Sequence, residues 1–211
     1  MKTGTILIVF LLCFGSASAQ QIIEKHIDFS GKESLSLKIQ IADSINLKTW
    51  NKNEIYIKAS LSINENRDND AYVTSFNEEG NTVVVKANFR DKYFQRKRDC
   101  CNNTDIFWQI YIPEKTSFSI ETINANITIT GHTKEMNVKS ISGYIDLAVP
   151  SDKQADIDFS TISGTMYSNH KLALNKSHSG VPSKINEKLN NGGDPIKLET
   201  ISGDIFFRKS D

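Results

Sequence analysis

A corner motif that occurs four times in the second half of the chain restricts the fold more than any other feature. Aligned on one isoleucine per copy, successive copies lie 18, 21 and 39 residues apart, and the last interval is close to two average units. A Thr or Ser precedes each isoleucine, and Ser-Gly follows it in three copies, with Asn-Ala in the first. Units of this length stack on one another, because one unit cannot bury its apolar face alone. The corner residues are Thr122, Ile123, Ser140, Ile141, Ser142, Gly143, Thr161, Ile162, Ser163, Gly164, Thr200, Ile201, Ser202 and Gly203.

The residues around each isoleucine predict a strand, a bend and a second strand that share one core. Apolar residues stand five and three positions before it, and an Ile or Met stands four positions after it. We expect the Thr or Ser, the isoleucine and the glycine to face inward as well. Every second residue then faces inward on each side of the corner, but the Thr and the isoleucine, which are neighbours, both face inward. The alternation therefore shifts by one residue between them. A flat strand would turn its apolar residues outward there, whereas a bulge or corner keeps them inward. The glycine would leave room for the next coil, and the hydroxyl would bond a backbone group exposed at the bend.

We therefore predict an all-β fold. Residues 116–211 are expected to form a parallel β-solenoid or two-sheet β-roll, continued or capped by antiparallel β-hairpins in residues 20–115. An antiparallel sandwich of the same short strands is the alternative. The Thr and Ser ladder could hold a ligand, but stacked small polar residues commonly serve as corners in repeat folds, so the structural interpretation is favoured.

Alternating apolar and polar residues predict strands in the N-terminal half. The segments are 34–41, 44–50, 54–63, 82–89 and 106–112, and the breaks between the first three are short and rich in turn-forming residues. No window has a sustained helical period, although a short helical turn is expected near Ser183 to Leu189.

Residues 1–19 have the composition of a secretory signal peptide. Lys2 precedes an apolar run from Ile6 to Phe14, and Ala17-Ser-Ala19 supplies the small residues of a cleavage site before Gln20. We expect a single all-β domain over residues 20–211, located in the periplasm, on the cell surface or outside the cell. The run is too short to span a bilayer and no later stretch is longer, so the mature protein is expected to lack a transmembrane segment.

Two irregular segments, 90–104 and 170–195, interrupt the strand pattern and are the preferred places for a ligand. The first is basic, and its competing interpretation is a solvated hairpin excursion. The chain has 25 Lys and Arg against 25 Asp and Glu, so its net charge gives no case for a nucleic-acid partner. The candidate ligand-loop residues are Tyr93, Arg96, Lys97 and Arg98.

No catalytic or metal-binding constellation is present in the sequence. The four histidines, His26, His132, His170 and His178, lack metal-ligand spacing, and the adjacent Cys100 and Cys101 lack further ligands nearby. We expect no catalytic residue, no metal and no cofactor. Carboxylates near the corners, Asp146 and Asp204 among them, keep a polysaccharide-active β-helix enzyme as an alternative.

The motifs resemble a known bacterial family. Thr161-Ile-Ser-Gly164, Glu199-Thr-Ile-Ser-Gly-Asp-Ile205 and the preceding Asn191-Gly-Gly-Asp-Pro-Ile-Lys-Leu198 are similar to the putative-adhesin domain of unknown function, as is Ala42-Asp-Ser-Ile-Asn-Leu-Lys-Thr-Trp-Asn51. The resemblance implies an exported, repetitive β protein of the bacterial envelope and brings no catalytic residues. The chain departs from the family pattern at Asn124-Ala125 and in segment 170–195.

These observations predict an adhesin-like binding or structural module of the cell envelope without catalysis. Its partner would be an envelope glycan or a surface protein, bound by the outward ladder of the repeat or by the irregular segments. A polysaccharide-active enzyme and an envelope scaffold without a small ligand are the alternatives.

Overall fold

The structure is a computed structural model that describes residues 20–91, 93, 103–172 and 183–210. The predicted all-β class is confirmed, since the described residues form strands and one short 3-10 helix, η1 (Asn69–Ala71). The strands are β1 (Gln21–Asp28), β2 (Ser34–Ile39), β3 (Ile41–Trp50), β4 (Glu54–Ile63), β5 (Tyr72–Glu79), β6 (Thr82–Phe89), β7 (Thr104–Pro113), β8 (Ser117–Thr130), β9 (Met136–Ser142), β10 (Ile145–Pro150), β11 (Ala155–Thr161), β12 (Met166–Ser168), β13 (Ser183–Leu189), β14 (Asp194–Ser202) and β15 (Ile205–Ser210).

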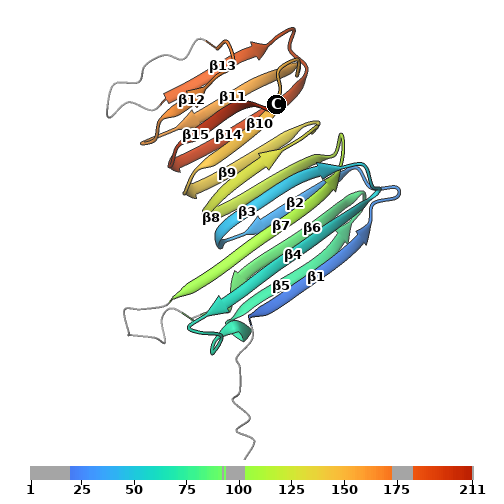
Figure 1. Cartoon of the computed structure of the whole chain (residues 1–211), viewed down its shortest axis with the longest axis vertical. Coiled ribbons are helices and arrows are strands. Elements are labelled where there is room, and N and C mark those ends of the chain that lie inside the picture. The colour runs from blue at the N-terminus through green and yellow to red at the C-terminus, as the bar shows by residue number, and fades with distance from the viewer. Residues whose placement is uncertain (1–19, 92, 94–102, 173–182, 211) are drawn as a thin grey trace, which may run out of the picture.

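Two layers of strands arise because β8 bends and takes part in both (Figure 1). Its second half, 124–130, pairs in parallel with β3 and β10, which gives a first sheet in the order β1-β4-β7-β3-β8-β10-β15-β12. Its first half, 117–122, pairs in parallel with β2 and β9, which gives a second sheet in the order β5-β6-β2-β8-β9-β14-β11-β13. Pairing is parallel throughout the repeat except at β13, and the N-terminal half adds antiparallel pairs at its edge.

The core lies between the two sheets and is built from the inward residues of each alternating strand. In β4, for example, every second residue from Ile55 to Ile63 is fully buried. Among the described residues, Trp108, Phe159 and Phe207 are the largest fully buried side chains. One hydrophobic cluster runs through both halves of the chain, so strands from the hairpins and from the repeat bury their apolar faces against a common core.

The fourth copy of the repeat lies between the second and third copies rather than after the third. β14 pairs with β9 on one side and β11 on the other, and β15 pairs with β10 and β12. The units therefore stack on one another as predicted in general, but at this point they do not follow the order of the chain. The physical reason is that the copies present equivalent corners and registers, so β14 can fill the slot beside β9. The outer edge of β11 is paired with β13 instead.

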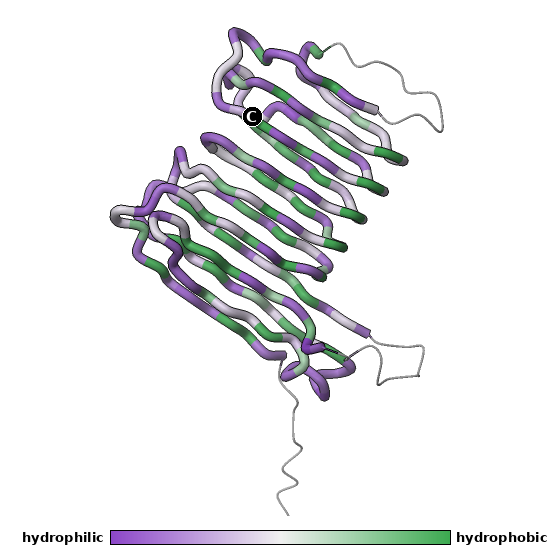
Figure 2. The backbone as a smooth tube through the Cα atoms, turned by 180° about the vertical axis from the view of Figure 1, so that it is seen from behind, coloured by the Kyte–Doolittle hydropathy of each residue, from purple (hydrophilic) through white to green (hydrophobic). Residues whose placement is uncertain are grey.

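The predicted inward position of the corner isoleucines is also wrong. Their side chains are 45–56% exposed at Ile123, Ile141, Ile162 and Ile201. Figure 2 shows the corresponding corners as a row of hydrophobic tips along one edge of the repeat. The Thr or Ser before each isoleucine is buried, and the next inward residue is the Gly or Ala two positions after it. The alternation of inward and outward residues therefore does shift by one at the corner. It shifts because the bend turns two consecutive residues outward, the isoleucine and the residue that follows it.

Close contact between stacked corners explains why a Gly or Ala stands two positions after each isoleucine. A Cβ built on Gly203 would lie 1.7 Å from the Gly143 carbonyl oxygen, and one on Gly164 would lie 1.8 Å from that of Gly203. One on Gly143, whose φ is +92°, would meet the carbonyl of Ala125 at 2.1 Å. Any side chain at these three glycines would clash with the backbone of the neighbouring corner. The first copy can carry Ala125 because it stands at the end of this row of corners.

Three of the four buried hydroxyls before the isoleucines bond backbone carbonyls at the bends, and the fourth, Thr200 Oγ1, has no hydrogen-bond partner among the described residues. Thr122 Oγ1 donates to Gln40 O at 3.2 Å, Ser140 Oγ to Ser142 O at 2.6 Å, and Thr161 Oγ1 to Gly203 O at 3.0 Å. Thr161 Oγ1 also accepts from Gly164 N at 3.0 Å. These bonds give the buried hydroxyls a partner inside the bend, which offsets the cost of burying them.

Residues 183–189 form strand β13 and not the helical turn expected from the sequence. Ile185 and Leu189 are four residues apart, a spacing that suits a helix, but both are buried in the core from an extended backbone. The antiparallel pairing with β11 over its whole length outweighs this local pattern, because it satisfies the backbone groups at the edge of the second sheet.

We expect Gly203→Ala to lower the free energy of unfolding by about 2–3 kcal/mol, since the new methyl group would force the stacked corners apart. Urea denaturation of residues 20–211 measures this change. Ser202→Ala, at the exposed neighbouring position, is the control and should stay within about 0.5 kcal/mol of the parent. An unchanged midpoint for Gly203→Ala would contradict the close contact of the corners.

Candidate functional site

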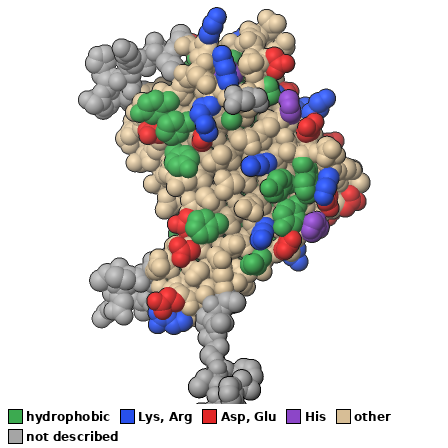
Figure 3. All heavy atoms as spheres, viewed as in Figure 1, with side chains coloured by type: hydrophobic (Ala, Val, Ile, Leu, Met, Phe, Trp, Pro, Cys, Tyr) green, Lys and Arg blue, Asp and Glu red, His purple; other side chains and the backbone are tan. Residues whose placement is uncertain are grey.

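The outer face of the first sheet carries the outward half of each alternating strand, aligned in rows by the register. One row crosses all eight strands of this sheet. It consists of Glu24, Lys58, Gln109, Asn46, Thr128, Asp146, Phe206 and Tyr167. Figure 3 shows hydrophobic side chains gathered at two places on the molecular surface, one over β10, β15 and β12 and one over the ends of β3, β4 and β7. Polar side chains occupy the row between these two places.

The first gathering is an aromatic cluster, defined as His26, Trp50, Tyr56 and Tyr111. The Trp50 ring centroid lies 5.3 Å from that of Tyr111 and 6.2 Å from that of Tyr56, and the two tyrosine rings lie 6.0 Å apart. Interplanar angles of 33–45° among these three rings give a shallow, continuous apolar surface. His26 extends it on β1, with its ring 4.8 Å from Tyr56.

Polar groups surround the rings and fix their orientation. Trp50 Nε1 donates to the Glu54 carbonyl oxygen at 2.8 Å, and the Tyr56 hydroxyl donates to Glu24 Oε1 at 2.8 Å. The hydrogen bond to Glu24 raises the pKa of Tyr56, so this hydroxyl stays a donor. His26 Nδ1 lies 3.3 Å from a Glu54 carboxylate oxygen, and Lys52 Nζ lies 4.6 Å from the Trp50 ring centroid. An apolar surface with a rim of carboxylates and amines suits a ligand that has both apolar faces and hydroxyl groups.

The second gathering is an aromatic ladder, defined as Tyr144, Phe206 and Tyr167. Tyr167 stacks on Phe206 with centroids 5.1 Å apart and planes 9° apart, and Tyr144 meets the Phe206 ring edge-on at 6.0 Å. Beside it, Asp146 accepts two hydrogen bonds from Arg208, one of them from Nε at 2.7 Å. The ladder lies about 24 Å from the aromatic cluster, as five strand spacings separate β4 from β15.

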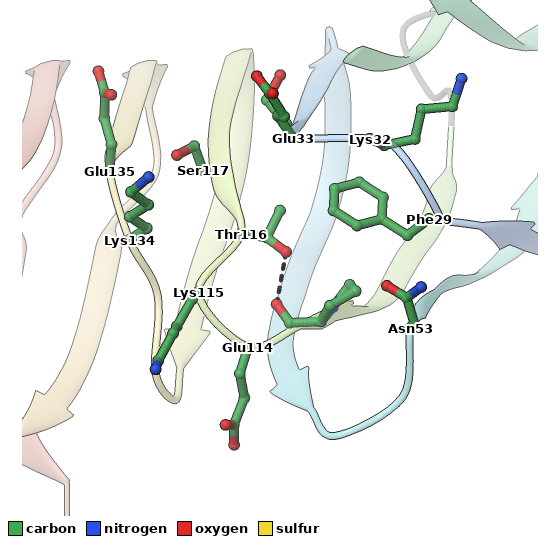
Figure 4. A pocket seen from close by; sticks show the side chains of 12 residues that line it. Phe29, Lys32, Glu33, Asn53, Glu114, Lys115, Thr116, Ser117, Lys134 and Glu135 are labelled. Atoms are coloured by element: carbon green, nitrogen blue, oxygen red, sulfur yellow. Dashed lines mark hydrogen bonds between the residues drawn. The ribbon is translucent and has the colours of Figure 1, made fainter. Parts of the chain in front are cut away.

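Two hollows open at the end of the sandwich next to the aromatic cluster. The larger has a volume of about 620 Å³ and is lined on one side by Asn53, Pro113 and Glu114, close to Trp50 in the chain and in the β3–β7 pairing. In Figure 4 the Phe29 ring points into this hollow, and the Glu33 and Glu135 carboxylates stand on the side away from Lys115. The smaller has a volume of about 380 Å³ and shares Lys115 and Lys134 with the first.

The carboxylates expected near the corners are engaged in structural bonds. Asp146 is held by Arg208, and Asp204 Oδ1 accepts from the backbone N–H of Thr165 at 2.8 Å. The ion pair with Asp146 raises the pKa of Arg208, which keeps the pair charged. Glu199 accepts from Lys197 and Lys139, and these bonds hold its pKa below the usual range. With its lowered pKa, Glu199 is a poor proton donor for glycosidic cleavage, which needs one acid with a raised pKa.

Of the four predicted ligand-loop residues, the structure describes Tyr93. Tyr93 is partly buried, with its ring stacked 5.0 Å from Phe89 and its hydroxyl 3.1 Å from both Asn64 Nδ2 and Asp68 Oδ2. Burial raises the pKa of Tyr93 to about 12. This side chain packs the base of its segment. The other three, Arg96, Lys97 and Arg98, lie outside the described residues, as do Cys100, Cys101 and His178.

The aromatic cluster was missed at the sequence level, although the parity of its strands contains the signal. Tyr56 stands between Ile55 and Ile57, and Tyr111 between Ile110 and Ile112, so the alternation that buries the isoleucines turns both tyrosines outward. Trp50 lies three residues after the inward-facing Leu47 in β3, so the same alternation turns it outward.

Within the described residues, no group of three or more His, Cys, Asp or Glu side chains could hold a metal ion. In the same residues, no helix has the length and apolar character needed to cross a membrane.

Comparison with known protein families gives one match, which lies in the repeat region. Residues 125–207 match the family model described as Toastrack DUF4097. The match agrees with the expected domain of unknown function, and it covers the last three corners of the repeat. No curated protein matches the chain at a significant level.

Among solved structures, the chain resembles a putative cell adhesion protein from Clostridium sporogenes ATCC 15579. The TM-score is 0.58 and the identity 14%, over 91% of this chain and 100% of that chain. At this identity the likeness shows the fold alone. A putative adhesin from Bacteroides fragilis NCTC 9343 aligns with a TM-score of 0.32 at 11% identity, over 92% of this chain and 100% of that one. A putative lipid binding protein from Parabacteroides distasonis ATCC 8503 aligns at 0.26 and 12%, over 90% and 97%. The last two scores are too low to carry an argument.

His170 makes the stability of the repeat depend on pH. Its ring is 6% exposed and stacks 4.4 Å from Phe207, and its Nε2 atom has no hydrogen-bond partner among the described residues. Burial lowers the pKa of His170, and the charge of Lys209 adds to this effect while a bond to the Arg208 backbone opposes it. Protonation therefore favours the unfolded chain, so the stabilising contribution is complete above the ordinary value near 6.5 and is lost as the pH falls below it.

We expect His170→Phe, which keeps the stacking surface but cannot titrate, to lose less stability between about pH 7.5 and about pH 5 than the parent chain. Urea midpoints at several pH values measure the difference. His132→Phe, at an exposed position, is the control and should leave the slope unchanged. Parallel pH profiles for parent and His170→Phe would contradict the assigned role.

Proposed function

We propose that this chain is an exported, non-catalytic binding module of the cell envelope whose aromatic cluster binds a carbohydrate. The observation that carries the proposal is the cluster itself: three partly exposed rings on adjacent strands, joined into one apolar surface and bordered by groups that accept or donate hydrogen bonds. A pyranose ring presents an apolar C–H face flanked by hydroxyl groups. It therefore matches the rings and the rim at the same time.

The cluster is also rigid before any ligand arrives. The residues that flank Tyr56 and Tyr111 along their strands are fully buried isoleucines, and the indole N–H of Trp50 is bonded to the Glu54 backbone. Binding to such a surface loses little side-chain entropy, which favours affinity for a flat ligand. Lys52, Glu24 and Glu54 lie at the border of the rings, where sugar hydroxyl groups would project.

A binding role is favoured over catalysis by the state of the carboxylates. Asp146 and Asp204, the acids considered for polysaccharide cleavage, are both committed to bonds that hold the stacked strands together. An adhesin-like role draws further support from the apolar, signal-like character of residues 1–19 and from the fold shared with a protein described as a cell adhesion protein. In this proposal the repeat is the rigid support and the aromatic cluster is the binding surface.

The proposal is tested by screening residues 20–211 on a glycan array and measuring the best ligand by calorimetry. Trp50→Ala should weaken binding by about tenfold or more, because about 1.4 kcal/mol or more of stacking energy is lost with the indole ring. Phe107→Ala removes a 42% exposed ring from the same sheet outside the cluster and should bind as the parent does. The absence of any glycan ligand would refute the proposal and favour an envelope scaffold. Equal losses for Trp50→Ala and Phe107→Ala would refute the assigned site.

A further inference from the structure

The smaller hollow is lined by basic side chains from consecutive turns. Its lining residues are Lys115, His132, Thr133, Lys134, Lys153 and Asp194, and its volume is about 380 Å³. The turns are stacked through their backbones, since Lys115 N donates to His132 O at 2.9 Å and Lys134 N to Thr116 O at 3.4 Å. Three coils thus bring a lysine to the same end of the sandwich, opposite the corners with the exposed isoleucines, and the coil of β14 brings Asp194.

The charges in this hollow are not balanced by the protein. Lys153 Nζ bonds Asp194 Oδ2 at 3.1 Å and the Thr133 carbonyl oxygen at 2.8 Å, so the single carboxylate is already paired. Lys115 and Lys134 form no ion pair with any residue that the structure describes. Their turns are adjacent at the spacing of neighbouring strands, about 4.8 Å, which is well within the screening length at physiological salt. Because both side chains line the same hollow, an anion bound in it would interact favourably with both charges.

Three nearby carboxylates line the larger hollow and are absent from the lining of the smaller one. They are those of Glu33, Glu114 and Glu135. In Figure 4, Lys134 points to the same side as Glu33 and Glu135, whereas Lys115 and Glu114 point to the opposite side. The smaller hollow therefore keeps a net positive lining of three lysines against one carboxylate.

The turns that carry Lys115 and Lys134, here called the basic corner, adjoin the aromatic cluster through direct hydrogen bonds. His132 N donates to Thr49 Oγ1 at 3.0 Å, one residue before Trp50, and Glu114 N donates to the Trp50 carbonyl oxygen at 3.0 Å. Gly131 packs so tightly on Thr49 that a Cβ there would meet Oγ1 at 2.0 Å. A chain of sugars stacked on Trp50 and Tyr111 would thus continue toward Lys115 and Lys134 without leaving the protein surface.

We propose that the carbohydrate bound by this chain is an acidic one, and that Lys115 and Lys134 bind its carboxylate or phosphate substituent while the aromatic cluster binds a sugar ring. This inference rests on the proposed function and names the class of its ligand. Carboxylate and phosphate share the chemistry that the lysines recognise, which is an anionic oxygen group at the edge of a sugar.

The test compares three matched oligosaccharides with the same backbone: one neutral, one with uronic acid carboxylates and one phosphorylated. Calorimetry with residues 20–211 is expected to show about tenfold tighter binding of at least one acidic form, reduced at high salt. Lys115→Gln with Lys134→Gln should abolish this preference while binding of the neutral form is unchanged. The control pair, Lys38→Gln with Lys86→Gln, makes the same charge change on the second sheet and should keep the preference.

The possible failures are distinguishable. Equal affinity for neutral and acidic forms, with Trp50→Ala still weakening both, overturns the acidic ligand but leaves the carbohydrate site. Loss of the preference in the control pair as well as in the corner pair overturns the site at Lys115 and Lys134, since net charge alone would explain it. Absence of binding by all three forms and by the array overturns the proposed function and this inference together. If one acidic oligosaccharide binds more tightly than the other, that difference identifies the preferred substituent as carboxylate or phosphate.

Discussion

Backbone contact between stacked corners is the constraint on which the rest of this structure depends. Where Gly143, Gly203 and Gly164 meet, no side chain fits, and the coils can therefore approach at the distance that hydrogen-bonded strands require. The bend at each corner sends one arm into each sheet. Both arms turn their apolar residues to a single core, while the buried hydroxyls of Thr122, Ser140 and Thr161 bond backbone carbonyls at the bends.

A core closed in this way fixes the outward residues as firmly as the inward ones. The register that pairs Ile57 with Ile110 also pairs Tyr56 with Tyr111, so the aromatic cluster inherits its geometry from the core beneath it. The turns on the opposite side from the isoleucine corners stack by the same register, which brings Lys115 and Lys134 next to each other and close to Trp50. The proposed binding surface is thus a consequence of stacking, with no loop that must fold around the ligand.

Much of the fold follows from the sequence, and the exceptions have physical reasons. Alternation predicts β2, β3, β4, β6 and β7 closely, whereas the edge strands β1 and β5 carry few buried residues and give a weak signal. The corner isoleucines break the rule that apolar residues face inward, since the neighbouring hydroxyl takes the inward place. The position of β14 between β9 and β11 could not be predicted, because equivalent copies pair equally well in either order. The alternation of inward and outward residues in the sequence could have predicted the aromatic cluster. The adjacent basic corner could not be predicted, because it depends on which turns stack on one another.

A crystal structure of residues 20–211 bound to an acidic oligosaccharide tests the account most directly. The account predicts a sugar ring packed against Trp50 and Tyr111, with its anionic substituent between Lys115 and Lys134 and the strand register unchanged. A sugar bound to the Tyr144–Phe206–Tyr167 ladder or to the exposed isoleucine corners, with the aromatic cluster empty, would contradict it.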